Sequence, residues 1–215
     1  MTQPVFAARL EVEGLSVARG GALIVRAAAF SVNSGGGAIL RGVNGAGKTS
    51  LLRAIAGLLP IASGSVSVIC QGKVYRDAAD RRMSAVYCGH GDGVKSAMTG
   101  IEHLRFWRAL YGAPRQRIDG AIGAFDLAAF LERPALHLSA GERRRLGLSR
   151  LLIAEKPLWL LDEPTAAIDA ASADRLSTLI ASHRARGGIV LVATHDKFEL
   201  PNAARLLIAP AERRS

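Results

Sequence analysis

A glycine-rich octapeptide in the first quarter of the chain carries the residue types that bind phosphate. Residues 42–49 read Gly-Val-Asn-Gly-Ala-Gly-Lys-Thr and fit the pattern GxxxxGK[ST]. Glycines let the backbone amides turn inward around phosphate oxygens, the lysine can reach the β and γ phosphates, and the threonine hydroxyl can hold Mg²⁺. We therefore predict that nucleotide contacts come from Gly42, Asn44, Gly45, Ala46, Gly47, Lys48, Thr49 and Ser50.

Two carboxylates follow a short apolar run much later in the chain. Asp162 and Glu163 come directly after residues 158–161, Leu-Trp-Leu-Leu. Ligands of an α/β sheet collect at the carboxyl ends of its strands. There Asp162 is expected to orient Mg²⁺ and its water, and Glu163 to polarise an attacking water. By themselves, the same residues would also fit a strand end followed by a solvated turn.

A histidine stands at a similar position after another apolar run. His195 follows residues 189–193 and one threonine, so it too is expected at the carboxyl end of a strand. A lone histidine is more often structural than catalytic. In this order along the chain, however, we interpret His195 as a sensor of the γ-phosphate.

Composition limits the class of protein. With 215 residues the chain can form one domain with a real core. Its apolar residues fall in short blocks and its start lacks the features of a signal peptide, so we expect it to remain in the cytosol without spanning a membrane. Cys70 and Cys88 are expected to be buried, reduced thiols. The net charge of +10 indicates an anionic partner: nucleotide, acidic membrane, another subunit or nucleic acid.

The first part of the chain predicts three strands and the helix that follows the glycine-rich loop. Alternation around residues 10–15 predicts an edge strand, and residues 22–32 predict a second strand of a small antiparallel sheet. Residues 38–40 predict the strand before the glycine-rich loop, and a helix from Lys48 should stop near Gly57.

The middle of the chain indicates helices and the last third indicates an α/β core. Helical spacing covers residues 101–111 and 118–131, which predicts a helical subdomain at about residues 95–150. Buried strands at 158–161 and 189–193 flank a helix at 170–186. This order predicts a parallel sheet within a single domain covering residues 1–215.

The segment between the two nucleotide motifs resembles a known signature. Residues 138–142, Leu-Ser-Ala-Gly-Glu, are similar to the signature sequence of ABC ATPases, although Ala140 and Glu142 depart from the usual Gly and Gln. The resemblance implies the ABC ATPase fold of P-loop NTPases: a RecA-like parallel-sheet core, a small antiparallel β subdomain and a helical subdomain. It also implies that Ser139 and Gly141 contact a γ-phosphate held by the opposite subunit. Ser139 and Glu142, three residues apart, also fit the pattern of a capping box at the start of a helix.

Three further positions follow from this resemblance. Asp169, in the run after Glu163, is expected near the dimer seam. Arg19 stands where ABC ATPases usually place an aromatic ring on adenine, and its guanidinium could either stack on the base or remain solvated. His90 replaces the usual glutamine that contacts Mg²⁺ and couples to the membrane subunit, which leaves metal contact there open.

Four short segments of the sequence resemble one subfamily of the ABC ATPases. Residues 88–91, residues 104–107, the arginines at 143–145 and residues 157–164 are similar to the ATPases of cytochrome c biogenesis, also called heme exporters. This resemblance implies ATP and Mg²⁺ as ligands and a homodimer attached peripherally to membrane subunits, at the cytoplasmic face of the inner membrane. Hydrolysis would drive heme export or release of a heme-loaded periplasmic chaperone, while this subunit itself is not expected to bind heme.

Two alternatives remain open at the level of sequence. The first is the ATPase subunit of another single-cassette transporter, for a lipid or small molecule. The second is a nucleic-acid-linked ABC ATPase, which the high pI of about 10.6 favours. The chain has neither a long coiled-coil insertion nor a second cassette, so we predict no nucleic-acid partner.

Overall fold

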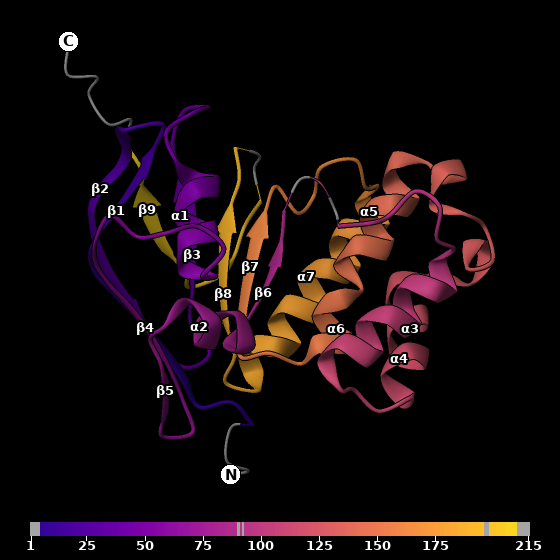
Figure 1. The fold of residues 1–215 in the computed structure, drawn as a ribbon. Coiled ribbons are helices and arrows are strands. Elements are labelled where there is room, and N and C mark those ends of the chain that lie inside the picture. Colours follow the sequence, from indigo (N-terminus) through magenta and orange to yellow (C-terminus); the bar gives the residue numbers. More distant parts are fainter. Residues whose placement is uncertain (1–4, 90, 92, 196–197, 210–215) are drawn as a thin grey trace. The chain divides into compact units, whose positions relative to one another are not determined.

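The computed structural model describes residues 5–89, 91, 93–195 and 198–209, and these form two compact units. The first unit comprises the described residues up to Tyr87, Lys156–Glu163 and the described residues from Ile180 onward. The second comprises the described part of Cys88–Glu155 together with Pro164–Leu179. Figure 1 shows the sheets of the first unit and the helices of the second.

An antiparallel sheet in the first unit has the order β2-β1-β4-β5. Its strands are β1 Ala8–Arg19, β2 Ala22–Val32, β4 Ser63–Cys70 and β5 Lys73–Tyr75. The prediction of an edge position for the first strand is wrong, because β1 pairs with β2 on one side and with β4 on the other. Alternation of apolar and polar residues indicates that one face of a strand is buried. It does not indicate how many neighbouring strands pair with that strand.

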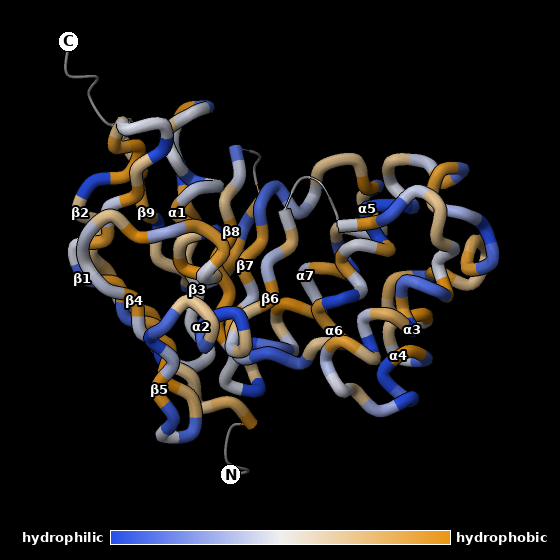
Figure 2. The backbone as a smooth tube through the Cα atoms, viewed as in Figure 1, coloured by the Kyte–Doolittle hydropathy of each residue, from blue (hydrophilic) through white to orange (hydrophobic). Residues whose placement is uncertain are grey.

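A second sheet in the same unit has the order β6-β7-β8-β3-β9. Its strands are β3 Gly37–Arg41, β6 Ala85–Cys88, β7 Leu158–Asp162, β8 Ile189–Ala193 and β9 Ala204–Leu207. The pairs β7 with β8 and β8 with β3 are parallel, as predicted. Strand β9, which was not predicted, also pairs with β3 in parallel. Every residue of β7 and β8 is buried, and Figure 2 shows the apolar character of these central strands. Apolar runs of this kind are typical of parallel strands covered on both faces.

Helix α1, Lys48–Ile55, joins the cores of the two sheets. Its buried side chains, Leu51 and Leu52 among them, share one cluster with residues of β1, β7 and β8. Gly57 adopts a φ of 74° just after the helix, and a Cβ there would lie 2.2 Å from the carbonyl oxygen of Ala78. The predicted stop at Gly57 is therefore confirmed, and only glycine fits it without strain.

Two arginines of α2, Ala78–Ser84, reach the far end of α1. Arg81 is buried and donates to the carbonyl oxygens of Ile55 and Ala54 at 3.2 and 3.3 Å. Arg82 donates to the carbonyl oxygen of Gly57 at 2.7 Å. Arg81 thus satisfies the last carbonyls of α1, and both cations complement the negative end of the helix dipole.

The second unit is helical, as predicted for the middle of the chain. Its helices are α3 Gly100–Tyr111, α4 Gln116–Phe125, α5 Ala140–Leu148 and α6 Arg150–Ala154, with 3-10 turns at Ala128–Phe130 and Ala135–His137. Helix α4 ends at Phe125, before the predicted Leu131, because Asp126 adopts a left-handed φ of 51°.

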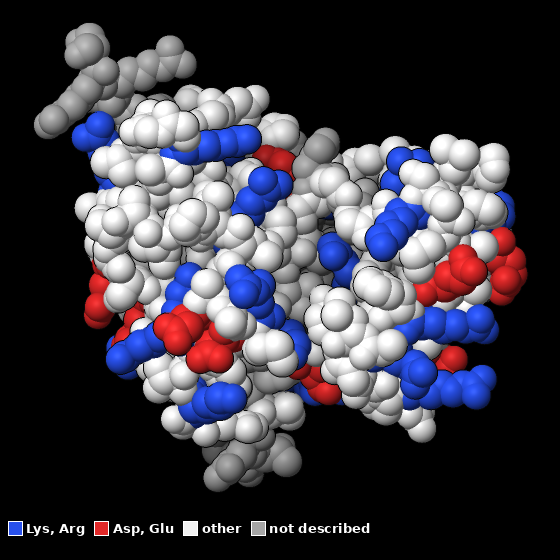
Figure 3. Space-filling view, in the orientation of Figure 1, with Lys and Arg blue, Asp and Glu red and all other residues white. Residues whose placement is uncertain are grey.

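Helix α7, Ala170–Ala185, runs from the second unit into the first and has 16 residues. Across the described part of the chain, no helix combines the length and apolar character needed to cross a membrane. On the face shown in Figure 3, lysines and arginines are spread over the surface and do not gather in one stripe.

The two cysteines differ in burial. Cys88 is buried, as predicted, whereas Cys70 is only half-buried and its thiol donates to the carbonyl oxygen of Phe6. Burial raises the pKa of the Cys70 thiol. Both are free thiols, so no disulfide joins the residues that the structure describes.

Candidate functional site

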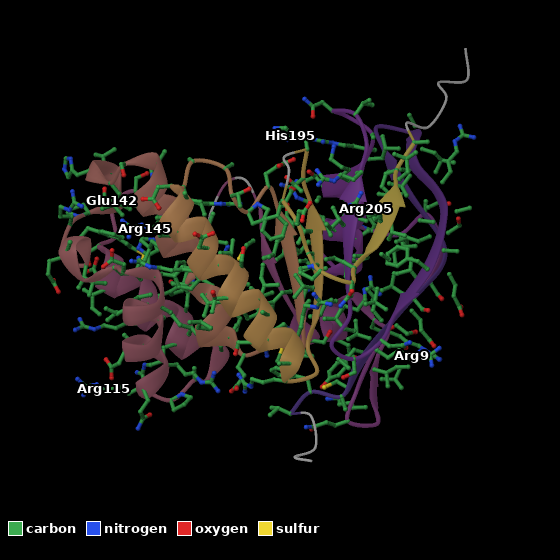
Figure 4. All side chains as sticks on the ribbon, turned by 180° about the vertical axis from the view of Figure 1, so that it is seen from behind. Arg9, Arg115, Glu142, Arg145, His195 and Arg205 are labelled. Carbon is green, nitrogen blue, oxygen red and sulfur yellow. The ribbon has the colours of Figure 1, made fainter. Side chains whose placement is uncertain are left out.

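One edge of the parallel sheet brings together three segments that are far apart in sequence. Strands β3, β7 and β8 are parallel neighbours, so their carboxyl ends meet at the same edge. The glycine-rich loop follows β3, Asp162 and Glu163 stand at the end of β7, and His195 follows β8. Figure 4 shows His195 at this edge. The sequence-based placement of these residues at strand ends is confirmed.

Glycine is needed in the loop because its backbone approaches neighbouring backbone closely. Gly42, Gly45 and Gly47 have φ values of 154°, 82° and 100°. A Cβ on Gly42 would lie 2.4 Å from the carbonyl oxygen of Ile208, and one on Gly47 would lie 2.7 Å from that of Ile24. Gly45 is exposed and meets nothing within 4 Å, so its requirement is the backbone angle alone.

Helix α1 presents its amino-terminal end at this loop. Lys48 is buried, and its ammonium donates to the carbonyl oxygens of Gly42 and Val43 at 2.7 and 3.2 Å. Among the described residues, no side chain caps α1 at Gly47 and no acidic residue stands in its first turn. A helix start of this kind attracts an anion. Asn44 is exposed, Ala46 is buried, and Thr49 and Ser50 are half-buried.

Asp162 is the last residue of β7 and only 4% exposed. The hydroxyl of Tyr87 donates to its Oδ2 at 3.0 Å, and Nε of Arg53 donates to the Tyr87 hydroxyl at 3.2 Å. Burial, and then the Asp162 carboxylate, raise the pKa of Tyr87 to about 12. A carboxylate with a threonine hydroxyl is an oxygen donor set that Mg²⁺ accepts, so Asp162 and Thr49 fit this metal chemically.

Glu163 is held by groups that follow β8. Its carboxylate accepts hydrogen bonds from the Thr194 hydroxyl at 2.9 Å, from the His195 amide at 3.2 Å and from His195 Nδ1 at 2.8 Å. The backbone of Glu163 has a φ of 48°, and its amide donates to the carbonyl oxygen of Ala193 at 2.8 Å. A non-glycine residue in this region is strained, and such strain gathers at functional sites.

Two further predicted contacts are Arg19 and His90. Arg19 ends β1, is exposed, and precedes the turn at Gly20 and Gly21. Its exposure is compatible with either stacking on a base or remaining solvated. His90 lies outside the described residues.

The signature segment belongs to the second unit, where Ser139 caps α5. The Ser139 hydroxyl accepts from the Glu142 amide at 3.2 Å, and the Glu142 carboxylate accepts from the Ser139 amide at 2.8 Å. The predicted capping box is therefore confirmed. Arg133 also pairs with Glu142. Burial raises the pKa of Glu142, but hydrogen bonds from Ser139 and Arg133 outweigh it and leave that pKa below its usual value.

Gly141 and Asp169 also lie in the second unit. A Cβ on Gly141 would stand 2.8 Å from the carbonyl oxygen of Ala167, which itself has a φ of 66°. Asp169 Oδ1 accepts from the Ser172 amide at 2.7 Å near the start of α7. This hydrogen bond holds the pKa of Asp169 below its usual value. Asp169 thus has a structural role in capping the helix.

Sequence reasoning missed three residues. Arg144 is buried in α5 and donates to the carbonyl oxygens of Gly89 at 2.7 Å and Pro164 at 3.3 Å. The sequence analysis used the arginines at 143–145 only as a similarity to one subfamily and assigned no contact to Arg144. Thr194 could have been found from its place beside His195. Nothing in the sequence marks the contact between Tyr87 and Asp162, 75 residues apart.

Comparison with known proteins places these features in a family. Residues 25–166 match the family model described as ABC transporter. The chain is 43% identical over 201 residues to the cytochrome c biogenesis ATP-binding export protein CcmA of Paracoccus denitrificans, covering 94% of this chain and 89% of the relative. The protein of the same name from Cereibacter sphaeroides is 42% identical with the same coverage.

A solved structure agrees at the level of the fold. The structure titled as the ATP binding subunit of an ABC transporter superposes with a TM-score of 0.76 at 26% identity, covering 86% of this chain and 79% of that one. The ABC ATPase fold predicted from the sequence is confirmed. The chain therefore belongs to the ABC transporter family, among the ATP-binding proteins of cytochrome c biogenesis.

Proposed function

We propose that the cluster at the sheet edge binds Mg-ATP and hydrolyses it. The observation that carries this is the position of Glu163, whose carboxylate is held by Thr194 and His195 at the same edge as the phosphate loop. A carboxylate fixed in this way can orient a water and accept its proton. Membership of the ABC transporter family supports the same activity.

Each residue has a separate task in this proposal. Lys48 and the amides that begin α1 bind the β and γ phosphates, and Thr49 with Asp162 would hold Mg²⁺. When bound, the metal neutralises charge on the phosphates. Glu163 takes the proton of the attacking water, and His195 keeps Glu163 in place and senses the γ-phosphate. Arg19 would lie against the base.

The complete site needs a second copy of the chain. In this proposal residues 1–215 act as one nucleotide-binding domain, and two such domains close around two ATP molecules. Ser139 and Gly141 of one subunit face the γ-phosphate held by the other, and Asp169 lies near the seam. His90 would couple the nucleotide site to the membrane subunits. The nucleotide affinity would depend on the phosphate loop and not on His90.

The biological role follows from the relatives' names. Proteins called cytochrome c biogenesis ATP-binding export protein are 40% or more identical to this chain over most of its length. We infer that a homodimer of this chain binds integral membrane subunits of the cytochrome c maturation system, peripherally, at the cytoplasmic face of the inner membrane. Hydrolysis would drive heme export or release of a heme-loaded periplasmic chaperone.

The variant Glu163→Gln tests both parts. It keeps the shape of the side chain but removes a base typically worth about 10²- to 10⁴-fold in rate, so ATP should still bind while hydrolysis nearly stops. Cells carrying only this variant should lack holocytochromes c in a heme stain of membranes, with heme retained on the chaperone.

A deletion of the gene separates the two claims. Normal holocytochrome in the deletion strain would overturn the role in cytochrome maturation and leave the ATPase intact. Normal hydrolysis by purified Glu163→Gln would instead overturn the catalytic assignment of this residue.

A further inference from the structure

We propose that Tyr87 is a positioning residue that orients the Asp162 carboxylate toward Mg²⁺, and that Arg53 fixes the hydroxyl of Tyr87 for this task. The inference rests on the proposed function, because it takes Asp162 as the residue that serves the metal. It adds two residues, from β6 and α1, to the machinery of the site.

The hydrogen bonds have a fixed direction. Nε of Arg53 donates to the Tyr87 hydroxyl at 3.2 Å, and that hydroxyl is 3.0 Å from Oδ2 of Asp162. A guanidinium has no acceptor, and an ionised carboxylate has no donor. The single proton of the tyrosine must therefore point at Asp162, and its oxygen accepts from Arg53. The contact is thus a donated hydrogen bond to a charged group, which is stronger than a neutral one.

Burial of Asp162 and a ring contact of Arg53 restrain these hydrogen bonds. Asp162 is 4% exposed, so its carboxylate meets little competing water. The Arg53 guanidinium also lies 5.7 Å from the centre of the Tyr87 ring, which restrains the ring as well as the hydroxyl.

The three residues connect the two ends of the metal site. Arg53 is in the last turn of α1, the helix that begins with Lys48 and carries Thr49 in its first turn. Asp162 ends β7, and Tyr87 is on β6, the neighbouring strand of the sheet. A shift of α1 on binding phosphate would therefore be transmitted through Arg53 and Tyr87 to the Asp162 carboxylate.

The variant Tyr87→Phe removes only the hydroxyl. In the full-length chain with Glu163→Gln, ATP affinity should fall about five- to tenfold with Mg²⁺ present and should not change in excess EDTA. Competition with Mn²⁺, followed by electron paramagnetic resonance with ATP bound, should show a similar loss of metal affinity. Tyr75→Phe is the matched control, because Tyr75 is a half-buried tyrosine of the same unit that contacts Lys73 and should leave both affinities unchanged.

A double-mutant cycle tests the part of Arg53. Arg53→Gln alone should weaken Mg²⁺-dependent binding about two- to threefold, and it should add nothing in the Tyr87→Phe background, because the two residues act in series. Full additivity of the two losses would overturn the role given to Arg53.

Asp162→Asn distinguishes failure of the inference from failure of the proposed function. If Asp162→Asn removes the Mg²⁺ dependence of ATP binding while Tyr87→Phe leaves it intact, Tyr87 only satisfies a buried polar group and the inference is overturned. If Tyr87→Phe weakens binding equally with Mg²⁺ and with EDTA, the residue is merely structural and the inference is likewise overturned. If ATP binding by Asp162→Asn retains its full Mg²⁺ dependence, the proposed metal site is wrong, and the inference is overturned together with it.

Discussion

Nδ1 of His195 lies 2.8 Å from Oε1 of Glu163, although 32 residues separate them in sequence. The same carboxylate accepts the Thr194 hydroxyl through its other oxygen at 2.9 Å. Both oxygens of Glu163 are thus oriented by the segment after β8, so the position of the proposed base depends on residues that do not themselves attack the phosphate.

Thr194→Val should lower kcat about tenfold with little change in ATP affinity. The replacement keeps the size of the fully buried side chain and removes one hydrogen bond to a charged group, worth about 1.5 kcal/mol, which corresponds to about tenfold in rate. Steady-state hydrolysis and equilibrium ATP binding separate the two quantities. Thr178→Val is the control, since Thr178 is exposed and its hydroxyl donates to the carbonyl oxygen of Asp174 in α7. A loss of affinity without a loss of kcat would contradict the assignment.

Gly141→Ala should destabilise the protein by about 1–3 kcal/mol, because the added Cβ would stand 2.8 Å from the carbonyl oxygen of Ala167 and overpack the site. Urea unfolding measures the change. Gly120→Ala in α4 meets nothing within 4 Å and should instead gain about 0.5–1 kcal/mol from helix propensity. Equal stability changes in the two variants would show that the contact with Ala167 is unimportant.

Stability should depend on pH through His183, which is 4% exposed and stacks on Trp159 with ring centres 4.0 Å apart. Burial lowers the pKa of His183 to about 4 from the ordinary 6.5. The unfolded chain therefore takes up a proton first as the pH falls. The contribution of neutral His183, about 3 kcal/mol, is complete above pH 6.5 and is lost between pH 6.5 and 4.

The variant His183→Gln tests this by removing the titrating group. Its free energy of unfolding should be lower at pH 7 but should change less between pH 7 and pH 4 than that of the unaltered chain. Parallel curves for the two proteins over this range would assign the acid sensitivity to other residues.

Arg19 should leave the base loosely held, because one stacking contact of a cation on a ring contributes only about 0.5–2 kcal/mol. GTP should therefore compete with ATP within about tenfold in a displacement assay, and Arg19→Tyr should strengthen the binding of both nucleotides. A preference for ATP of several hundredfold would show that another residue reads adenine.

The sequence was sufficient where function depends on neighbouring residues. The loop at 42–49, the strand ends at Asp162 and His195, and the cap at Ser139 follow from spacing within a few residues, and the structure places them as predicted. The second strand was predicted with its observed bounds, Ala22–Val32, because turns mark both of its ends.

Contacts between distant residues could not be predicted in this way. The pair Tyr87 and Asp162 exists because β6 lies beside β7, and the order of strands in a sheet is not contained in their hydrophobic pattern. The contacts of Arg144 could not be predicted for a similar reason, since the carbonyls that accept its hydrogen bonds come from residues 55 and 20 positions away. A buried arginine is stable only with such partners, and these appear only with the tertiary structure.

The position of strand β9 beside β3 affects when the phosphate loop can fold during synthesis of the chain. It pairs with β3, the Ile208 amide donates to the Arg41 carbonyl oxygen at 2.7 Å, and the Ile208 carbonyl oxygen lies against Gly42. The phosphate loop thus receives backbone support from a segment about 160 residues downstream. On the ribosome, the loop emerges early but waits for almost the whole chain before it reaches its final shape, so a nascent chain stalled before β9 should not be rescued by nucleotide.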